Sequence, residues 1–172
     1  MLTHIDHVGI ACRDLEEKIE LYCSTFGLTV TAREVHEEQG VREAMLLVAT
    51  ADPGPAQAGP PAGPDPRAAA GTAVEWAPPG GFLALGSYIQ LLEPLGPDSP
   101  VGKFLARRGE GIHHIGYGVT DVRAALAAIS ATGIRLVDER PRHGSMGASI
   151  AFLHPADLGG VLTELVEHPL AD

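Results

Sequence analysis

Cysteine and long apolar runs are scarce in this sequence, and their scarcity excludes several classes of protein. The two cysteines, Cys12 and Cys23, are too few for a disulfide framework. No apolar stretch approaches the roughly 18 residues that indicate a transmembrane helix, and the N-terminal segment MLTHIDHVGI lacks the pattern of a secretory signal. We therefore expect a protein with free thiols that works in the cytoplasm and has no membrane partner.

Basic residues are also in short supply. The 172 residues include 12 Lys and Arg against 22 Asp and Glu, which gives a net charge of −10 with neutral His. This balance argues against general binding to nucleic acids or anionic membranes, while local basic pairs such as Arg140 and Arg142 remain available for a small anion. The apolar fraction of 45% is enough to form the core of one ordinary domain.

The sequence contains an internal repeat. Residues 5–15, IDHVGIACRDL, return as residues 112–122, IHHIGYGVTDV, with Ile, His, Gly and Asp in register. Strand alternation puts His7 on the same face as Gly9, and His114 on the same face as Gly116, so that small residues leave room beside each imidazole. The same alternation predicts that His113 faces away from His114 and lies outside any shared site.

A second echo marks the ends of the two halves and reveals an insertion. Residues 90–93, QLLE, correspond to residues 164–167, ELVE, and a Pro-Leu pair follows each. The first half is longer because of residues 52–81, which are mostly Pro, Gly and Ala and bury too little apolar surface to offset their ordering entropy. We expect residues 1–99 to form a first module with this segment as a surface loop, and residues 100–172 a second module of the same domain.

Capping residues and periodicity predict the elements. Asp14 can cap a helix that Gly27 ends, and Asp121 can cap a second helix that stops before Gly133. A short helix is predicted between the halves, at residues 101–108. Strands are predicted at residues 5–11, 42–49, 82–93, 112–119, 135–139, 148–153 and 160–168, and residues 72–77 can add a further strand to the first half. We read each half as βαβββ, which makes the fold class α+β.

Each half carries one potential metal ligand near its start and one near its end. If the halves pack as pseudo-twofold copies, four side chains converge: His7, Gln90, His114 and Glu164. Two imidazoles and two oxygen donors suit an intermediate divalent ion such as Co²⁺, Mn²⁺, Ni²⁺ or Zn²⁺, with positions left for substrate or water. Taken singly, each residue is more simply a hydrogen-bonded strand histidine or a solvated polar group. Their equivalent positions in the repeat favour a shared site.

Five segments in a fixed order carry a family resemblance: IDHVGIA, EEQGVREAML, YIQLLEPL, GIHHIGYGV and IAFLHPADLGGVLTELVEHP. They resemble the methylmalonyl-CoA epimerase family of the vicinal oxygen chelate group, over nearly the whole chain except residues 52–81. The resemblance implies the vicinal oxygen chelate fold, in which two βαβββ modules form one cupped mixed sheet with a pseudo-twofold repeat. It also implies a homodimer with a bound divalent metal, with Co²⁺ as the first candidate.

The activity implied by the resemblance is metal-dependent interconversion of (2R)- and (2S)-methylmalonyl-CoA, a coenzyme A thioester, by 1,1-proton transfer through a metal-stabilised enolate. The implied metal ligands are His7, Gln90, His114 and Glu164. Glu43 and Glu164 match the two acid/base groups, one for each face of the α-carbon. The implied substrate-binding residues are Gly144, Ser145 and Gly147, in a loop whose backbone N–H groups can bind an anion.

Other functions remain open at this point. One is epimerisation of a related 2-alkylmalonyl-CoA such as ethylmalonyl-CoA. Another is a metal isomerase of the glyoxalase I type, which more typically has Glu where this chain has Gln90 and lacks the carboxylate of Glu43. A third is a metal-free drug-binding protein of the same fold, which would need neither four ligands nor Glu43.

Overall fold

A computed structural model describes residues 1–48 and 87–169. The loop predicted at residues 52–81 and the start of the strand predicted at 82–93 lie outside these ranges. The strands are β1 (Leu2–Ala11), β2 (Thr29–His36), β3 (Val41–Val48), β4 (Ser87–Pro94), β5 (Gly111–Val119), β6 (Arg142–His143), β7 (Ser149–Leu153) and β8 (Thr163–Glu167). The α-helices are α1 (Leu15–Phe26), α2 (Pro100–Arg108) and α3 (Val122–Ser130). Within the described ranges, no helix has the length and apolarity needed to cross a membrane.

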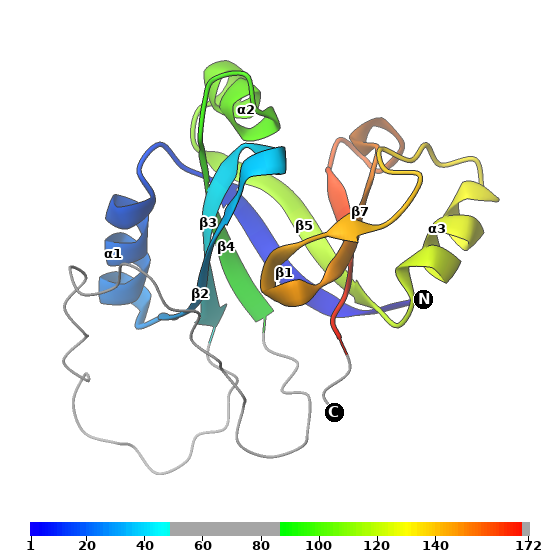
Figure 1. The fold of residues 1–172 in the computed structure, drawn as a ribbon, viewed down its shortest axis with the longest axis horizontal. Coiled ribbons are helices and arrows are strands. Elements are labelled where there is room, and N and C mark those ends of the chain that lie inside the picture. Colours follow the sequence, from blue (N-terminus) through cyan, green and yellow to red (C-terminus); the bar gives the residue numbers. More distant parts are fainter. Residues whose placement is uncertain (49–86, 170–172) are drawn as a thin grey trace, which may run out of the picture.

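The strands form one mixed sheet in the order β2-β3-β4-β1-β5-β8-β7-β6. At its centre β1 pairs antiparallel with β5, and each of these strands pairs parallel with the last strand of its own half, β4 or β8. The order is therefore the same when read outward from the centre in either direction, and the sheet curls into a half-barrel (Figure 1). The predicted α+β fold with a pseudo-twofold repeat is confirmed, and we propose residues 99 and 100 as the boundary between the modules.

The helices begin where the capping residues predict. The carboxylate of Asp14 accepts the N–H of Glu17 at 3.0 Å, and Gly27 ends α1 in the left-handed conformation with φ 69°. Asp121 caps α3 in the same way by accepting the N–H of Ala124 at 2.9 Å. The short helix predicted at residues 101–108 is α2, with Ser99 as its cap.

Each half has its own core between a helix and the sheet. In the first half Leu15 and Ile19 of α1 pack with buried residues of β3 and β4, including Leu46 and Leu91. In the second half Val122 and Leu126 of α3 pack with buried residues of β7 and β8, including Leu153 and Leu165. Because α1 and α3 pack on one face of the sheet, its other face is available to line a site.

Two strand predictions need correction. No strand is predicted at β2, an edge strand that is paired only with β3 and has no fully buried residue. The strand predicted at residues 135–139 is wrong, because this segment makes a single bridge between Leu136 and Leu153. The carboxylate of Asp138 accepts the N–H of Phe152 at 2.9 Å. In a regular β-ladder this N–H would donate to a backbone carbonyl, so the side chain of Asp138 replaces a backbone partner.

Candidate active site

The four predicted ligands lie in two adjacent rows across the four central strands. Gly9 of β1 is the register partner of both Gln90 on β4 and His114 on β5. Gly116 of β5 is likewise the partner of both His7 on β1 and Glu164 on β8. A Cβ built on Gly9 would overlap the imidazole of His114, and one on Gly116 would overlap that of His7. The two glycines thus hold open the space that the imidazoles fill, as their positions in the repeat predict.

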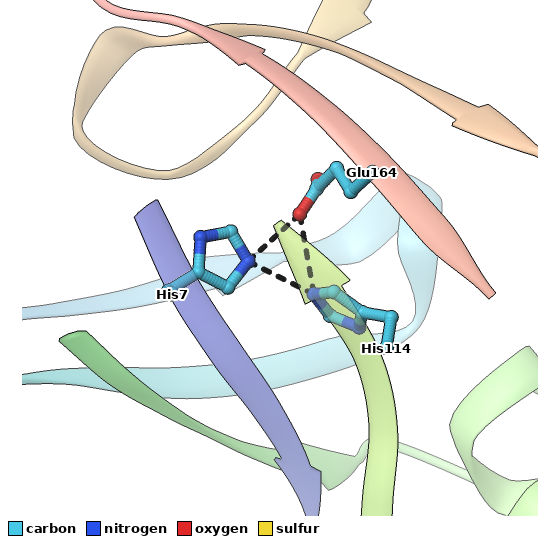
Figure 2. Close-up of side chains that lie close together, drawn as sticks. All are labelled: His7, His114 and Glu164. Carbon is cyan, nitrogen blue, oxygen red and sulfur yellow. Dashed lines mark hydrogen bonds and ion pairs between the residues drawn. The ribbon is translucent and has the colours of Figure 1, made fainter. Parts of the chain in front are cut away.

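Three of the ligand side chains meet at a point (Figure 2). Nε2 of His7 lies 2.9 Å from Nε2 of His114, and Oε2 of Glu164 lies 2.8 Å and 3.2 Å from these two nitrogens. Atoms bound to one cation at roughly 2.0–2.2 Å are about 3 Å apart when they are neighbours in its coordination shell. The observed spacing therefore fits a single divalent ion.

The hydrogen bonds of the Gln90 side chain also support a metal site. Its amide nitrogen donates to Glu43 Oε2 and to Ser145 Oγ, both at 2.9 Å. Its oxygen, Oε1, is buried and has no hydrogen-bond partner among the described residues. A buried carbonyl oxygen without a partner is costly unless a donor or cation binds it. The donor set of two imidazoles, one carboxylate and one amide oxygen fits the predicted metal.

The charges of the ligands are set by their burial and by one another. Burial lowers the pKa of His7, but the carboxylates of Asp6 and Glu164 outweigh it and raise the pKa to about 10. Burial raises the pKa of Glu164, but His114 and His7 outweigh it and lower the pKa to about 2. Without a cation, a proton on His7 therefore compensates the buried carboxylate of Glu164 at neutral pH.

A neighbouring side chain holds the outer nitrogen of each imidazole. Nδ1 of His7 lies 2.8 Å from Asp6 Oδ1, and Nδ1 of His114 lies 3.0 Å from Nδ1 of His113. Burial and the nearby His114 lower the pKa of His113 to about 4, so that His113 is neutral at pH 7. Such outer contacts orient metal-binding imidazoles.

The prediction that His113 points away from His114 is wrong. The pairing of β1 with β5 is irregular between Gly9 and Ile10, where His113 is the extra residue, and this β-bulge turns His113 into the cavity. One signal in the sequence could have found it, because the repeat aligns His113 with Asp6. The residue before each ligand histidine then has the same place in both halves.

Glu43 lies in the same cavity, deeply buried with 4% of its surface exposed. Its Oε1 lies 3.2 Å from Nε2 of His36 and also accepts the hydroxyl of Ser145, while its Oε2 accepts the amide of Gln90. His36 is absent from the cavity lining but contacts Glu43 from β2, a strand that the sequence did not predict.

The cavity between the carboxylates of Glu43 and Glu164 has a volume of about 220 Å³. Much of its wall is apolar and comes from both halves: Val41, Leu92, Val101, Ile150, Phe152 and Leu162. Of the three predicted substrate-binding residues, Gly144 and Ser145 line this cavity and Gly147 does not. Two carboxylates that face one small apolar chamber can exchange protons with a substrate held between them.

Substitution of Gly116 tests the requirement for space beside His7. We expect Gly116→Ala to displace the imidazole and to weaken binding of Co²⁺ by about 10- to 100-fold, the range typical of outer-shell changes at metal sites. Gly96→Ala is the matched control, because a Cβ at Gly96 meets no atom within 4 Å. Titration calorimetry with both variants measures the difference. Equal affinities would show that His7 tolerates the added methyl group.

The raised pKa of His7 predicts how metal binding depends on pH. A metal ligand must be deprotonated, and His7 holds a proton below about pH 10 in the metal-free protein. Binding therefore releases this proton, and the apparent affinity rises with pH by up to about tenfold per unit between pH 6 and 9. Calorimetry in buffers with different ionisation enthalpies counts the released protons. A pH-independent affinity would contradict the site.

A family model now gives the class of protein. The model described as Glyoxalase/Bleomycin resistance protein/Dioxygenase superfamily matches residues 6–152. The chain belongs to this superfamily.

Individual proteins similar to this chain are methylmalonyl-CoA epimerases. The chain is 31% identical to the mitochondrial methylmalonyl-CoA epimerase of Dictyostelium discoideum, over 95% of this chain and 77% of that protein. It is 30% identical to the ethylmalonyl-CoA/methylmalonyl-CoA epimerase of Cereibacter sphaeroides, over 96% of this chain and 98% of that one. Among solved structures, a Glu-to-Gln variant of the Streptomyces coelicolor methylmalonyl-CoA epimerase, in complex with 2-nitronate-propionyl-CoA, is 45% identical with a TM-score of 0.77. That match covers 99% of this chain and 100% of the other.

Proposed function

We propose that this chain is an epimerase that interconverts the (2R) and (2S) forms of methylmalonyl-CoA. The observation that carries the proposal is the pair of buried carboxylates, Glu43 and Glu164, that face one cavity beside the imidazoles of His7 and His114. Epimerisation at a carbon requires a proton to leave one face and another to arrive at the opposite face. Each face then needs its own acid/base group.

Glu43 and Glu164 supply the two groups. One begins each turnover as a carboxylate and takes the α-proton, while the other begins as a carboxylic acid and donates a proton to the opposite face. For the other epimer the roles exchange. Ser145 and Gln90 orient the carboxylate of Glu43 through their hydrogen bonds, which fixes the direction from which it reaches the α-carbon.

His7, Gln90, His114 and Glu164 would hold the divalent metal, for which Co²⁺ is our first candidate. When bound, the metal supplies Lewis-acid stabilisation for the negative charge that develops on the thioester oxygen. The apolar residues Val41, Leu92 and Phe152 exclude water from the reacting carbon, which strengthens every electrostatic interaction in the cavity.

The substrate's anionic groups need local positive or dipolar partners in this acidic protein. We propose that Gly144, Ser145 and Gly147 bind the substrate carboxylate; Gly144 and Ser145 line the cavity. The N–H of Gly144 itself donates to the carbonyl oxygen of Ala148 at 2.9 Å. Arg142 also lines the cavity, and its guanidinium lies 5.1 Å from the centre of the Phe152 ring. We further propose a homodimer that works in the cytoplasm, which the family resemblance and the free thiols of Cys12 and Cys23 support.

Exchange of the α-proton tests the function directly. Purified protein loaded with Co²⁺ should epimerise (2R)- and (2S)-methylmalonyl-CoA and should introduce deuterium from deuterated water, and a chelator should abolish both reactions. The same assay with ethylmalonyl-CoA measures the preference for the acyl chain. No exchange with either compound would contradict the proposal and favour another isomerase of the superfamily.

A further inference from the structure

A histidine outside the cavity contacts the buried base Glu43. His36 ends β2, and its Nε2 lies 3.2 Å from Glu43 Oε1 and 3.2 Å from Glu34 Oε2. Glu34 and Glu43 are register partners on β2 and β3. Since Glu34 and His36 are two residues apart on one strand, both side chains point to the same face as Glu43.

His36 joins a buried group to the surface. The side chain of His36 is 18% exposed, whereas that of Glu43 is 4% exposed. His36 does not line the cavity, so it can act on a substrate only through Glu43. Hydrogen bonding to Glu43 raises the pKa of His36 above its ordinary value, against a smaller effect of burial that lowers it.

The loop at residues 144–147, part of which lines the cavity, is hydrogen-bonded to the same group of side chains. Glu34 Oε1 accepts the N–H of Met146 at 2.8 Å, and the hydroxyl of the preceding residue, Ser145, donates to Glu43 Oε1. Met146 has a left-handed backbone with φ 54°, the only such non-glycine residue in the described ranges. His36 is therefore fixed between two carboxylates, both of which are bonded to this loop.

We propose that His36 is a positioning residue through which the proton on Glu43 exchanges with solvent. After Glu43 takes the α-proton, its carboxylic acid passes a proton to Nε2 of neutral His36. The imidazolium then releases a proton to water, and Glu43 is again a carboxylate. No oxidant or further reactant is needed. The inference rests on the proposed function, because it assigns Glu43 the role of base.

Deuterium exchange from each epimer separately provides the test. A proton that returns from Glu43 to the same face of the carbon labels the recovered substrate only if Glu43 has first exchanged with solvent. In wild type, the number of deuterium exchanges from the epimer that Glu43 deprotonates should therefore exceed the number of inversions. In His36→Asn and His36→Gln this excess should be lost for that epimer, while exchange from the other epimer is unchanged. Mass spectrometry follows the deuterium and circular dichroism follows epimerisation.

The variants separate proton transfer from support of the fold. Gln can donate a hydrogen bond to Glu43 but cannot relay a proton, so an excess retained in His36→Gln would overturn the proposal. Loss of exchange from both epimers alike would also overturn it. Added imidazole should restore the excess in His36→Ala. Val35→Ala, at the adjacent exposed position, should behave as wild type. If wild type fails to epimerise at all, the proposed function is wrong instead.

Discussion

Glu43→Gln is expected to reduce epimerisation by about 10²- to 10⁴-fold, the usual contribution of a general acid/base group. The substitution keeps the size of the side chain and its place beside Ser145 and Gln90, but removes the carboxylate that takes or gives a proton on one face. Glu164 remains and can still remove and replace the proton on its own face. The variant should therefore exchange the α-proton of one epimer with solvent much faster than it inverts the carbon.

Two comparisons make this result specific. Glu20→Gln removes an exposed carboxylate from α1 and should leave both exchange and epimerisation unchanged. Mass spectrometry of each epimer after incubation in deuterated water, with circular dichroism for inversion, gives the two rates. Epimerisation by Glu43→Gln at the wild-type rate would show that another group serves this face of the carbon.

His114→Ala should abolish specific metal binding and, with it, turnover. His114 supplies one of the three ligand atoms that lie within 4.8 Å of one another. Its removal leaves only His7 and Glu164 of these three to bind the ion. We expect the affinity for Co²⁺ to fall by more than about 100-fold, beyond what outer-shell changes cost. Because a ligand that binds only the folded state raises its stability, Co²⁺ should raise the Tm of wild type but not of the variant.

His154→Asn is the matched control for this prediction. His154 caps a turn by accepting the N–H of Ala156, and Asn keeps a side-chain acceptor for that purpose. This variant should bind Co²⁺ as wild type does. An unchanged rise in Tm with Co²⁺ in His114→Ala would mean that the ion binds elsewhere.

The central strands of the fold could be predicted because their residues repeat. The copies that begin at Ile5 and Ile112 have the same alternation, and the structure pairs them at the centre of the sheet. The outer strands carry weaker signals. β2 has no buried residue to mark its inner face, and β6 has only two residues, since Asp138 interrupts the pairing that the sequence predicted before it.

The site residues that could be predicted are those that occupy equivalent positions in the two halves. His7 matches His114 and Gln90 matches Glu164, and all four are buried in two adjacent rows of the central strands. Glu43 has no such partner, because Ile150 stands at the corresponding place in the second half, and only the family resemblance indicated it. Contacts made through a bulge or across a loop, as at His113 and His36, depend on distances that the order of residues does not contain.

The register of β3 and β4 has a consequence for engineering. Val48 and Ser87 are direct partners, so the residues between them need only join two neighbouring strand ends, about 5 Å apart. The eight register pairs between β3 and β4 keep Met45 beside Gln90. A reporter domain inserted at this junction would therefore be held by two paired strand ends while that alignment is kept.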